Sequence, residues 1–396
     1  MLLLLLALQS PACDADNGGL KLPPGFCATV VAKDLIGVRH LAISPDGSIF
    51  AGRQGKDGGL YYLRDTTGDG KIDLVSRIFD TAGTGVVWTP DAVYFSPEDR
   101  VLRFPWKPGA RTPSGSPEVI VQGLPTGGHT AKSMVLGKDG SLFVVVGSMT
   151  NSCQEKDRAS KSPGVKPCKE LETRAGIWRF DSRKAGQTQA SGKRWGTGLR
   201  NAMAMSLAPD GTLWAAVHGR DQLTQNWGFS EEDGAENPAE ELGPITEGID
   251  YGWPYCYYDP RNKRKVQTPE YGGDGTAQGD CGSKAQPAVA FPAHWAPNAT
   301  VFYTGTMFPA RFRGGVFVAF HGSWNRAPKP QQGFRVAFAP FENGKATGQF
   351  EDFALPAGEP NSIRPSGLAV GPDGSLYIGA DREGKIWRVV SVSGKP

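Results

Sequence analysis

Long hydrophobic runs are scarce in this sequence, and after the first few residues no segment approaches the roughly 20 apolar residues that a membrane-spanning helix needs. An excess of one charge is also missing, because 43 lysines and arginines stand against 40 aspartates and glutamates. This near balance gives no reason to expect nucleic acid or an anionic membrane as a bulk partner. Uninterrupted helical periodicity is absent too, which argues against a helical fold.

Glycine and proline, by contrast, are abundant, with 53 and 31 residues in a chain of 396. Both residues interrupt helices and populate turns. Together they stay below the proportion that marks a low-complexity chain. The composition therefore predicts a turn-rich β fold, and the length allows a large buried core.

The N-terminus has the features of a targeting segment. Residues 2–8 form a short apolar run, and residues 14–19 are polar. The run is too short to span a bilayer but fits a signal peptide, so residues 1–19 are predicted to be a signal and a polar linker. Cys13 follows the small residue Ala12, as the lipid-modified cysteine of a bacterial lipoprotein does. The expected location is the periplasm, or the outer face of a membrane with a lipid anchor at Cys13; the alternative is a cytoplasmic protein with an apolar start.

Cysteine usage agrees with export. The chain has six cysteines: Cys13, Cys27, Cys153, Cys168, Cys256 and Cys281. The third and fourth enclose one polar loop and the last two enclose another, while the spacings typical of zinc sites are absent. We expect a disulfide across each loop, formed in an oxidising compartment. The second cysteine lies in an apolar strand and is either a buried free thiol or, if the first carries no lipid, its disulfide partner.

One ten-residue phrase recurs along the chain: a short apolar strand, a tight turn centred on Asp-Gly, and a second apolar strand. It occupies residues 41–50, 134–143, 205–214 and 368–377, with a weaker copy at 92–101. Asp-Gly supplies the positive φ that two-residue hairpin turns require. A further strand follows most copies. Units of several antiparallel strands repeated in this way are typical of propeller blades.

We count six blades from the five copies of the phrase and a sixth unit with strands at 315–320 and 333–338. The first strand, residues 26–31, is expected to complete the last blade and so close the ring. Insertions at 150–174 and 221–245 explain the uneven spacing. The sequence therefore predicts an all-β, six-bladed β-propeller in one domain, residues 24–391. A two-domain β-sandwich is the alternative, but sandwiches do not repeat one hairpin phrase.

Reactive side chains concentrate at the ends of predicted strands. Three of only five histidines stand there next to glycines: His129, His218 and His321. In a propeller the loops between blades converge on a funnel where a ligand can bind, and glycine allows close approach. Arginines at strand ends, among them Arg200 and Arg364, suit an anionic ligand with several carboxylates. His40 and His294 lack this context and are interpreted as structural.

Several of these segments resemble the glucose/sorbosone dehydrogenase family. The matching segments are 126–140, 198–201, 250–254 and 321–326, in the same order and over nearly the whole chain. Shorter phrases, such as 146–153, are most similar to the sorbosone dehydrogenase-like branch. Members of the family are six-bladed propellers, and many use pyrroloquinoline quinone (PQQ) with calcium. The resemblance implies an enzyme that oxidises a sugar or sugar aldehyde by hydride transfer to PQQ and passes electrons to an external acceptor, since no CxxCH haem motif is present.

The resemblance also implies roles for single residues. His129 matches the family's catalytic base, which takes the proton of the substrate hydroxyl. Gly219 and Arg220 match two positions whose backbone carbonyls bind calcium. The matching cofactor ligands are Arg200, Asn201 and Arg364, with further candidates in His321, Trp324, Asn325 and Arg326.

The sequence departs from the family pattern at three positions. Gly128 stands before the base, where glucose-oxidising members carry Asp, so glucose specificity is not expected. Met203 replaces a Gln beyond the Arg-Asn pair, and Ser366 replaces the second arginine of a late pair. A relative that uses the same scaffold without PQQ is therefore the alternative.

A second calcium candidate lies in the loop that begins at Asp65. Its oxygen-bearing residues alternate as in the first half of an EF-hand loop, with glycine at position six and no glutamate at position twelve. The candidate ligands are Asp65, Thr67, Asp69 and Asp73. The alternative is a hairpin turn closed by side-chain hydrogen bonds.

Two other functions fit a propeller. A lactonase-type hydrolase would need side-chain carboxylates and calcium at the centre of the funnel, where this sequence offers mainly arginine, histidine and asparagine. A non-catalytic propeller that binds carbohydrate or a partner protein would need neither a base nor clustered arginines.

Overall fold

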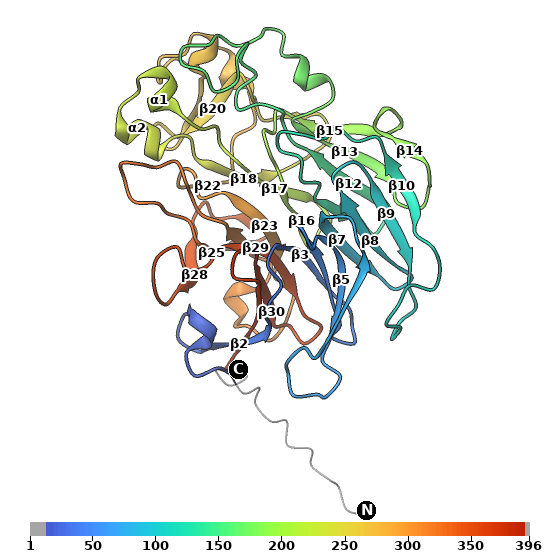
Figure 1. Ribbon diagram of the computed structural model, residues 1–396. Helices are drawn as coiled ribbons and strands as arrows, with labels where there is room; N and C mark the ends of the chain where they lie inside the picture. The colour runs from blue at the N-terminus through green and yellow to red at the C-terminus, as the bar shows by residue number, and fades with distance from the viewer. Residues whose placement is uncertain (1–12, 393–396) are drawn as a thin grey trace, which may run out of the picture.

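The computed structural model describes residues 13–392, which form six antiparallel sheets arranged as blades around a central axis (Figure 1). The first three blades are β3 (Val38–Ile43), β4 (Ile49–Arg53), β5 (Gly59–Arg64) and β6 (Leu74–Phe79); β7 (Gly83–Thr89), β8 (Ala92–Pro97), β9 (Val101–Pro105) and β10 (Glu118–Gln122); β11 (Met134–Leu136), β12 (Ser141–Val146), β13 (Gly176–Asp181) and β15 (Lys193–Thr197). The last three are β16 (Ala204–Leu207), β17 (Leu213–Val217), β18 (Glu240–Pro244) and β22 (Val289–Phe291); β23 (Pro297–Phe302), β24 (Val316–Phe320), β25 (Arg335–Ala339) and β28 (Glu351–Pro356); β29 (Pro365–Val370), β30 (Leu376–Ala380), β31 (Lys385–Ser391) and β2 (Phe26–Ala32). The predicted all-β, six-bladed propeller is confirmed.

Short strands complete the sheets. β1 (Leu20–Lys21), β14 (Gln187–Thr188) and β19 (Ile249–Asp250) lie at the outer edges of the fifth, second and third blades. β20 (Cys256–Asp259) pairs with β21 (Arg264–Gln267), and β26 (Phe341–Glu342) pairs with β27 (Lys345–Ala346).

The N-terminal strand closes the ring, as the sequence predicted. β2 pairs antiparallel with β31, so the last blade combines one strand from the start of the chain with three from its end. Cys13 and Cys27 form a disulfide that ties the segment before β2 to this strand. The bond uses the sulfur atom that a lipid anchor on Cys13 would need, so the structure supports the disulfide alternative. Residues 1–12, where the signal peptide is predicted, lie outside the described residues.

The recurring phrase forms the same turn in several blades. Between β3 and β4, Asp46 Oδ1 accepts the backbone N–H of Ser48 at 3.2 Å, and Gly47 has a φ of 81°. Equivalent bonds run from Ser141 to Asp139 and from Ser375 to Asp373. The weaker copy at 92–101 differs, because it forms the β8–β9 hairpin, the second and third strands of its blade. The inner strand β7 precedes it.

Apolar side chains fill the interfaces between sheets. Between the fifth and sixth blades, Phe317, Phe338, Phe353 and Trp387 are each at most 1% exposed. The ring centroids of Phe317 and Phe353 lie 4.7 Å apart. Burying side chains of this size contributes about 1.5–3 kcal/mol each, so these interfaces hold the blades together.

Residues of all six inner strands, β3, β7, β11, β16, β23 and β29, line a cavity of about 340 Å³ on the axis. His40 lies in it and contacts the Asn298 carbonyl oxygen through Nε2 at 2.8 Å, in keeping with a structural histidine. The inner strands approach closely: a Cβ at Gly367 of β29 would lie 2.1 Å from the Arg39 carbonyl oxygen of β3.

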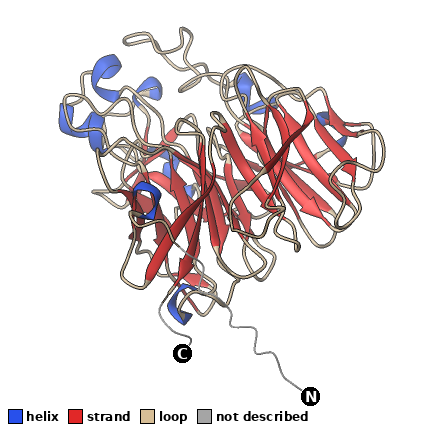
Figure 2. Cartoon of the chain, turned by 60° about the horizontal axis from the view of Figure 1, so that its bottom comes forward, coloured by secondary structure: helices blue, strands red, loops and turns tan. Residues whose placement is uncertain are grey.

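Insertions between strands collect above one end of the propeller. The segment between β17 and β18 contains helices α1 (Leu223–Trp227) and α2 (Glu231–Glu236), which lie near β20 in Figure 1. Ser230 caps α2 by accepting the Asp233 N–H. Figure 2 shows these loops and short helices projecting beyond the ends of the strands. Among residues 13–392, no helix is both long and apolar enough to cross a membrane.

Two further disulfides close these insertions, and both confirm predicted pairs. Cys153 is bonded to Cys168 in the insertion between β12 and β13. Cys256 is bonded to Cys281 in the segment after β19. With the bond near the N-terminus, all six cysteines are paired.

Candidate active site

One end of the propeller collects the predicted site residues. In each blade the start of the inner strand and the end of the next strand lie at the same edge, because neighbouring strands are antiparallel. His129 precedes β11 and Arg200 precedes β16, whereas His218 follows β17 and His321 follows β24. Antiparallel pairing therefore brings residues from three neighbouring blades to one end of the propeller, called the funnel below.

His129 is held in a single tautomer by the neighbouring strand end. Its Nδ1 lies 3.0 Å from the Ser148 carbonyl oxygen and 3.0 Å from Ser148 Oγ. A carbonyl can only accept, so Nδ1 carries the proton and Nε2 has a free lone pair. Nε2 has no hydrogen-bond partner in residues 13–392. Burial, together with the charges of Arg200 and His218, lowers the His129 pKa to about 3, so the imidazole is neutral.

Glycines make room beside this histidine. A Cβ on Gly147 would lie 2.6 Å from His129 Cβ and 3.3 Å from Asn201 Oδ1. A Cβ on Gly128 would lie 2.5 Å from the Met149 carbonyl oxygen. The close approach of three segments around His129 therefore depends on glycine at both positions.

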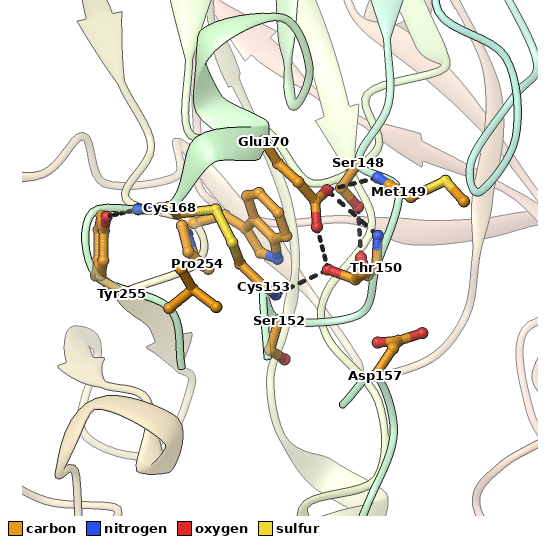
Figure 3. Close-up of a disulfide and its surroundings, with 12 residues drawn as sticks. Ser148, Met149, Thr150, Ser152, Cys153, Asp157, Cys168, Glu170, Pro254 and Tyr255 are labelled. Atoms are coloured by element: carbon orange, nitrogen blue, oxygen red, sulfur yellow. Dashed lines mark hydrogen bonds between the residues drawn. A yellow bond between two sulfur atoms is a disulfide. The ribbon is translucent and has the colours of Figure 1, made fainter. Parts of the chain in front are cut away.

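A disulfide-bonded loop supports Ser148 (Figure 3). The Glu170 carboxylate accepts hydrogen bonds from the Met149 N–H at 2.6 Å and from the Thr150 hydroxyl. Thr150 Oγ1 also accepts the Cys153 N–H at 2.9 Å, next to the bond to Cys168. The Ser148 hydroxyl donates to the Thr150 carbonyl at 2.7 Å. This chain of contacts links the disulfide to the orientation of the histidine ring.

Asp221 is the electrostatic centre of the funnel. Its Oδ2 accepts from Arg200 Nη2 at 2.9 Å and from Arg158 Nη2 at 3.0 Å, and its Oδ1 accepts from Asn325 Nδ2 at 2.6 Å. Burial opposes ionisation, yet Arg200, His294 and Arg158 hold the pKa of Asp221 well below its usual range. The carboxylate is therefore charged and fully paired.

Arg200 is buried beneath the funnel surface and only 4% exposed. Its Nε and Nη2 donate to Asn151 O at 3.2 Å and Asn151 Oδ1 at 3.1 Å, and its Nη1 donates to Gly219 O at 2.7 Å. With the bond to Asp221, four of its five N–H groups are used within the protein. The predicted cofactor ligand is thus also a structural residue.

Two asparagines at the funnel carry acceptors without partners. Asn201 is 6% exposed, and its buried Oδ1 has no hydrogen-bond partner in the described part of the chain. Asn325 Oδ1 is likewise buried and unsatisfied, while its Nδ2 is fixed by Asp221. An unsatisfied buried polar atom costs about 1–3 kcal/mol, so both positions favour a polar ligand.

A second cluster surrounds His321, in the fifth blade. Its Nε2 lies 2.9 Å and 3.0 Å from the two Asp381 carboxylate oxygens, and Asp381 also pairs with Arg39 at 2.7 Å. Arg364 Nη1 donates to the His321 carbonyl at 3.2 Å and faces its Nδ1 at 3.4 Å. The guanidinium of Arg364 lies over the Phe334 ring, 4.9 Å from its centroid. Its Nε and Nη2 have no partner in residues 13–392 and can receive an anion.

Other predicted ligands have different surroundings. Arg326 is 1% exposed and donates to the carbonyls of Pro330, Ala293 and Ala235 and to Glu236, so it anchors α2. Trp324, by contrast, is 64% exposed. The Arg158 guanidinium lies 5.9 Å from its ring centroid. The predicted stretch 321–326 therefore contributes His321 and Asn325 to the polar lining and Trp324 to the exposed surface.

The predicted calcium ligands were the backbone carbonyls of Gly219 and Arg220. In this structure the Gly219 carbonyl accepts a hydrogen bond from Arg200 at 2.7 Å, and the Arg220 side chain pairs with Glu270 at 2.6 Å. In the loop at 65–73, Asp65 accepts the N–H groups of Thr67 and Gly70. These contacts match the hydrogen-bonded turn that was the alternative for this loop. No three His, Cys, Asp or Glu side chains of residues 13–392 are grouped to hold a metal ion.

Sequence reasoning assigned no role to Asp221, Asn151, Glu170 or Asp381. Asp221 directly follows residues 218–220. A carboxylate next to an arginine that is predicted to line the funnel could have indicated an ion pair there. Asn151 and Glu170 lie in an insertion and Asp381 follows β30, so their partners are distant in sequence.

Comparisons with known proteins agree with this architecture. A family model described as TrAA12-like matches residues 20–392. The PQQ-dependent pyranose dehydrogenase of Coprinopsis cinerea is 25% identical over 240 residues, which cover 51% of this chain and 32% of that protein. The chain thus spans about a third of the length of that relative. An uncharacterized protein of Borreliella burgdorferi is 27% identical over 199 residues, 48% of this chain and 47% of that protein.

Solved structures share the fold. The PQQ domain of the Coprinopsis cinerea pyranose dehydrogenase superposes with a TM-score of 0.78 at 20% identity, covering 94% of this chain and 97% of that domain. A Trichoderma reesei enzyme of family AA12 gives 0.79 at 18% identity, with 94% and 98% coverage. The Escherichia coli aldose sugar dehydrogenase gives 0.62 at 16% identity, with 92% and 99% coverage. The family match over nearly the whole described chain shows that this protein belongs to the TrAA12-like family, and the predicted resemblance to PQQ-dependent sugar dehydrogenase propellers is confirmed.

Proposed function

We propose that this protein is an exported quinoprotein oxidoreductase that oxidises a sugar with PQQ. The observation that carries the proposal is His129, whose neutral ring has Nδ1 fixed by Ser148 and Nε2 free at the funnel. The pyranose and aldose sugar dehydrogenases that share this propeller support the substrate class.

The polar lining fits a flat, polycarboxylate cofactor. Arg364 offers unpaired guanidinium N–H groups to a carboxylate, whereas the unsatisfied amide oxygens of Asn201 and Asn325 can accept from an N–H or O–H of the ligand. These residues would hold PQQ, which has three carboxylates and, when bound, supplies a quinone that accepts hydride from the sugar carbon. The aromatic ring of Phe334 supports the arginine from behind. Calcium has no role in this proposal, because the Gly219 carbonyl faces a guanidinium.

His129 would act as the base. A sugar hydroxyl that donates a hydrogen bond to Nε2 would lose its proton to this atom. Hydride would leave the carbon that bears this hydroxyl and pass to the quinone. The resulting imidazolium keeps its Nδ1–H bond to the Ser148 carbonyl, which stabilises the new charge. A pKa near 3 is low for this task, but carboxylates of a bound cofactor would offset the charge of Arg200 and raise the pKa toward neutrality.

The proposal extends to the substrate, the electron acceptor and the location of the protein. Gly128, in place of an acidic residue, disfavours glucose, so the proposed substrate is a sorbosone-type aldehyde or another pyranose. An external molecule would take up the electrons. The three disulfides support export to an oxidising compartment.

A lactonase-type hydrolase is not favoured. Asp221 and Asp381 are each paired with arginine, and the buried Glu240 carboxyl accepts the backbone N–H groups of Gly219 and Ala296. Neither Asp221 nor Asp381 is free to bind a metal or activate water in this arrangement.

Reconstitution tests the proposal. Purified protein would be loaded with PQQ and assayed for dye reduction against a panel of pyranoses, aldoses and sugar aldehydes, with His129→Ala as the matched control. PQQ-dependent turnover that is lost in the variant supports the assignment. PQQ binding without turnover on any sugar would refute the substrate class, and failure to bind PQQ would refute the cofactor.

A further inference from the structure

We propose that the Arg200 guanidinium takes the place of a divalent cation at the Gly219 carbonyl, so that this chain binds its anionic cofactor without calcium. The inference rests on the proposed function for the identity of the cofactor. The exclusion of calcium depends only on the contacts around the Gly219 carbonyl.

The Gly219 carbonyl oxygen and three oxygens around it already accept hydrogen bonds from one guanidinium. Arg200 Nη1 lies 2.7 Å from the Gly219 carbonyl oxygen. The neighbouring oxygens of Asn151 accept from the same guanidinium, and Asp221 Oδ2 accepts from it as well. Calcium takes six to eight oxygen ligands at about 2.3–2.6 Å, so it would compete with Arg200 for every one of these atoms.

Charge opposes a second cation at the same oxygen. An ion bound to Gly219 O would lie at most about 5 Å from Arg200 Nη1, inside a poorly hydrated region. Arg158 adds another positive charge at Asp221, 3.0 Å from Oδ2. The Asp221 carboxylate faces two guanidinium groups and cannot also neutralise a divalent ion.

Arg200 cannot easily withdraw to admit calcium. Its side chain is 4% exposed, and Asn151 binds it through both the carbonyl and the side-chain oxygen. Asn151 in turn donates to the Asp221 carbonyl at 3.0 Å and accepts the Asp221 N–H at 2.9 Å. Moving the guanidinium would leave this network unsatisfied in the protein interior.

One N–H group of Arg200 is still available for the cofactor. The second hydrogen on Nη1 has no acceptor among the described residues. The cation that a polycarboxylate meets here is therefore a fixed guanidinium rather than an exchangeable ion.

Two measurements test the inference. In the first, wild-type protein and the Asp69→Ala variant, which removes a ligand of the other candidate loop, are dialysed against CaCl₂ and their calcium content is measured. We expect no calcium to be retained by the variant. Calcium retained by the variant at one ion per chain would overturn the inference.

In the second, PQQ is titrated into wild-type protein by quenching of tryptophan fluorescence, in EGTA and in CaCl₂. We expect the two dissociation constants to agree within about threefold. A loss of affinity of about tenfold or more in EGTA, restored by calcium, would overturn the inference. If PQQ binds in neither buffer, the proposed cofactor is wrong, and the calcium content of the Asp69→Ala variant still decides whether the Gly219 position takes the ion.

Discussion

The substitution Arg200→Ala should lower thermal stability, because it removes four charge-assisted hydrogen bonds from the interior. These bonds join Arg200 to Asn151, Gly219 and Asp221. Breaking a buried ion pair by removing one partner costs about 3–5 kcal/mol. Asp221 keeps Arg158 and Asn325 as partners, so we expect the lower end of that range, about 3 kcal/mol.

The expected shift in melting temperature follows from chain length. An unfolding entropy of about 2.1 cal/mol/K per residue gives roughly 0.8 kcal/mol/K for a chain of this size. A loss of about 3 kcal/mol then lowers Tm by about 4 °C.

Arg364→Ala is the matched control, since it removes the same kind of side chain from a different blade, at the start of the inner strand β29. Arg364 side-chain bonds reach His321 alone among residues 13–392, so Tm should fall by less than about 1 °C. PQQ affinity should fall by roughly ten- to a hundredfold, the loss expected for one charge-assisted bond to a carboxylate.

Differential scanning calorimetry of cofactor-free protein and fluorescence titration with PQQ measure both effects. A melting temperature of Arg200→Ala within 1 °C or so of wild type would refute the stabilising role of the buried network. Unchanged PQQ titration in Arg364→Ala would remove Arg364 from the cofactor site.

The remaining predictions concern the base, the disulfide loop and pH. His129→Gln should retain PQQ but lose about 10²–10⁴-fold in kcat, and near-normal turnover would end the assignment of the base. Cys153→Ser combined with Cys168→Ser should lower stability by about 3 kcal/mol on the chain-entropy model and lower kcat by loosening Ser148; an unchanged kcat would show that the loop does not orient His129. Burial raises the pKa of Glu240 to about 7, so between pH 4.5 or so and about 7 the folded state holds a proton that the unfolded state has lost, and stability should fall as pH rises. Urea titrations should show that Glu240→Gln flattens this part of the profile, and an equally steep profile in the variant would contradict the assignment to Glu240.

Much of the architecture was predictable because its signals are local. An Asp-Gly turn between two apolar strands closes through contacts two residues apart, as between Ser48 and Asp46. Repetition of this turn predicted the blades, and the apolar strand at 26–31 predicted the closure of the ring. The copy at 92–101 forms the expected hairpin, but with the second and third strands of its blade rather than the first and second. A hairpin pattern alone does not specify which strands of a blade it joins.

The sequence by itself therefore determined the six blades, the closing strand, the disulfide pairs at 153/168 and 256/281, and the placement of His129 at a strand end. The tertiary structure alone decided which arginines are free. The Arg326 side chain donates to α2 and the Arg200 side chain donates to Asp221. Arg364, by contrast, has N–H groups without a partner in residues 13–392. Asp221 lies 21 residues from Arg200 and Ala235 lies 91 residues from Arg326, both in the insertion between β17 and β18. Contacts over such distances depend on how the blades assemble, because no local turn or strand pattern specifies them.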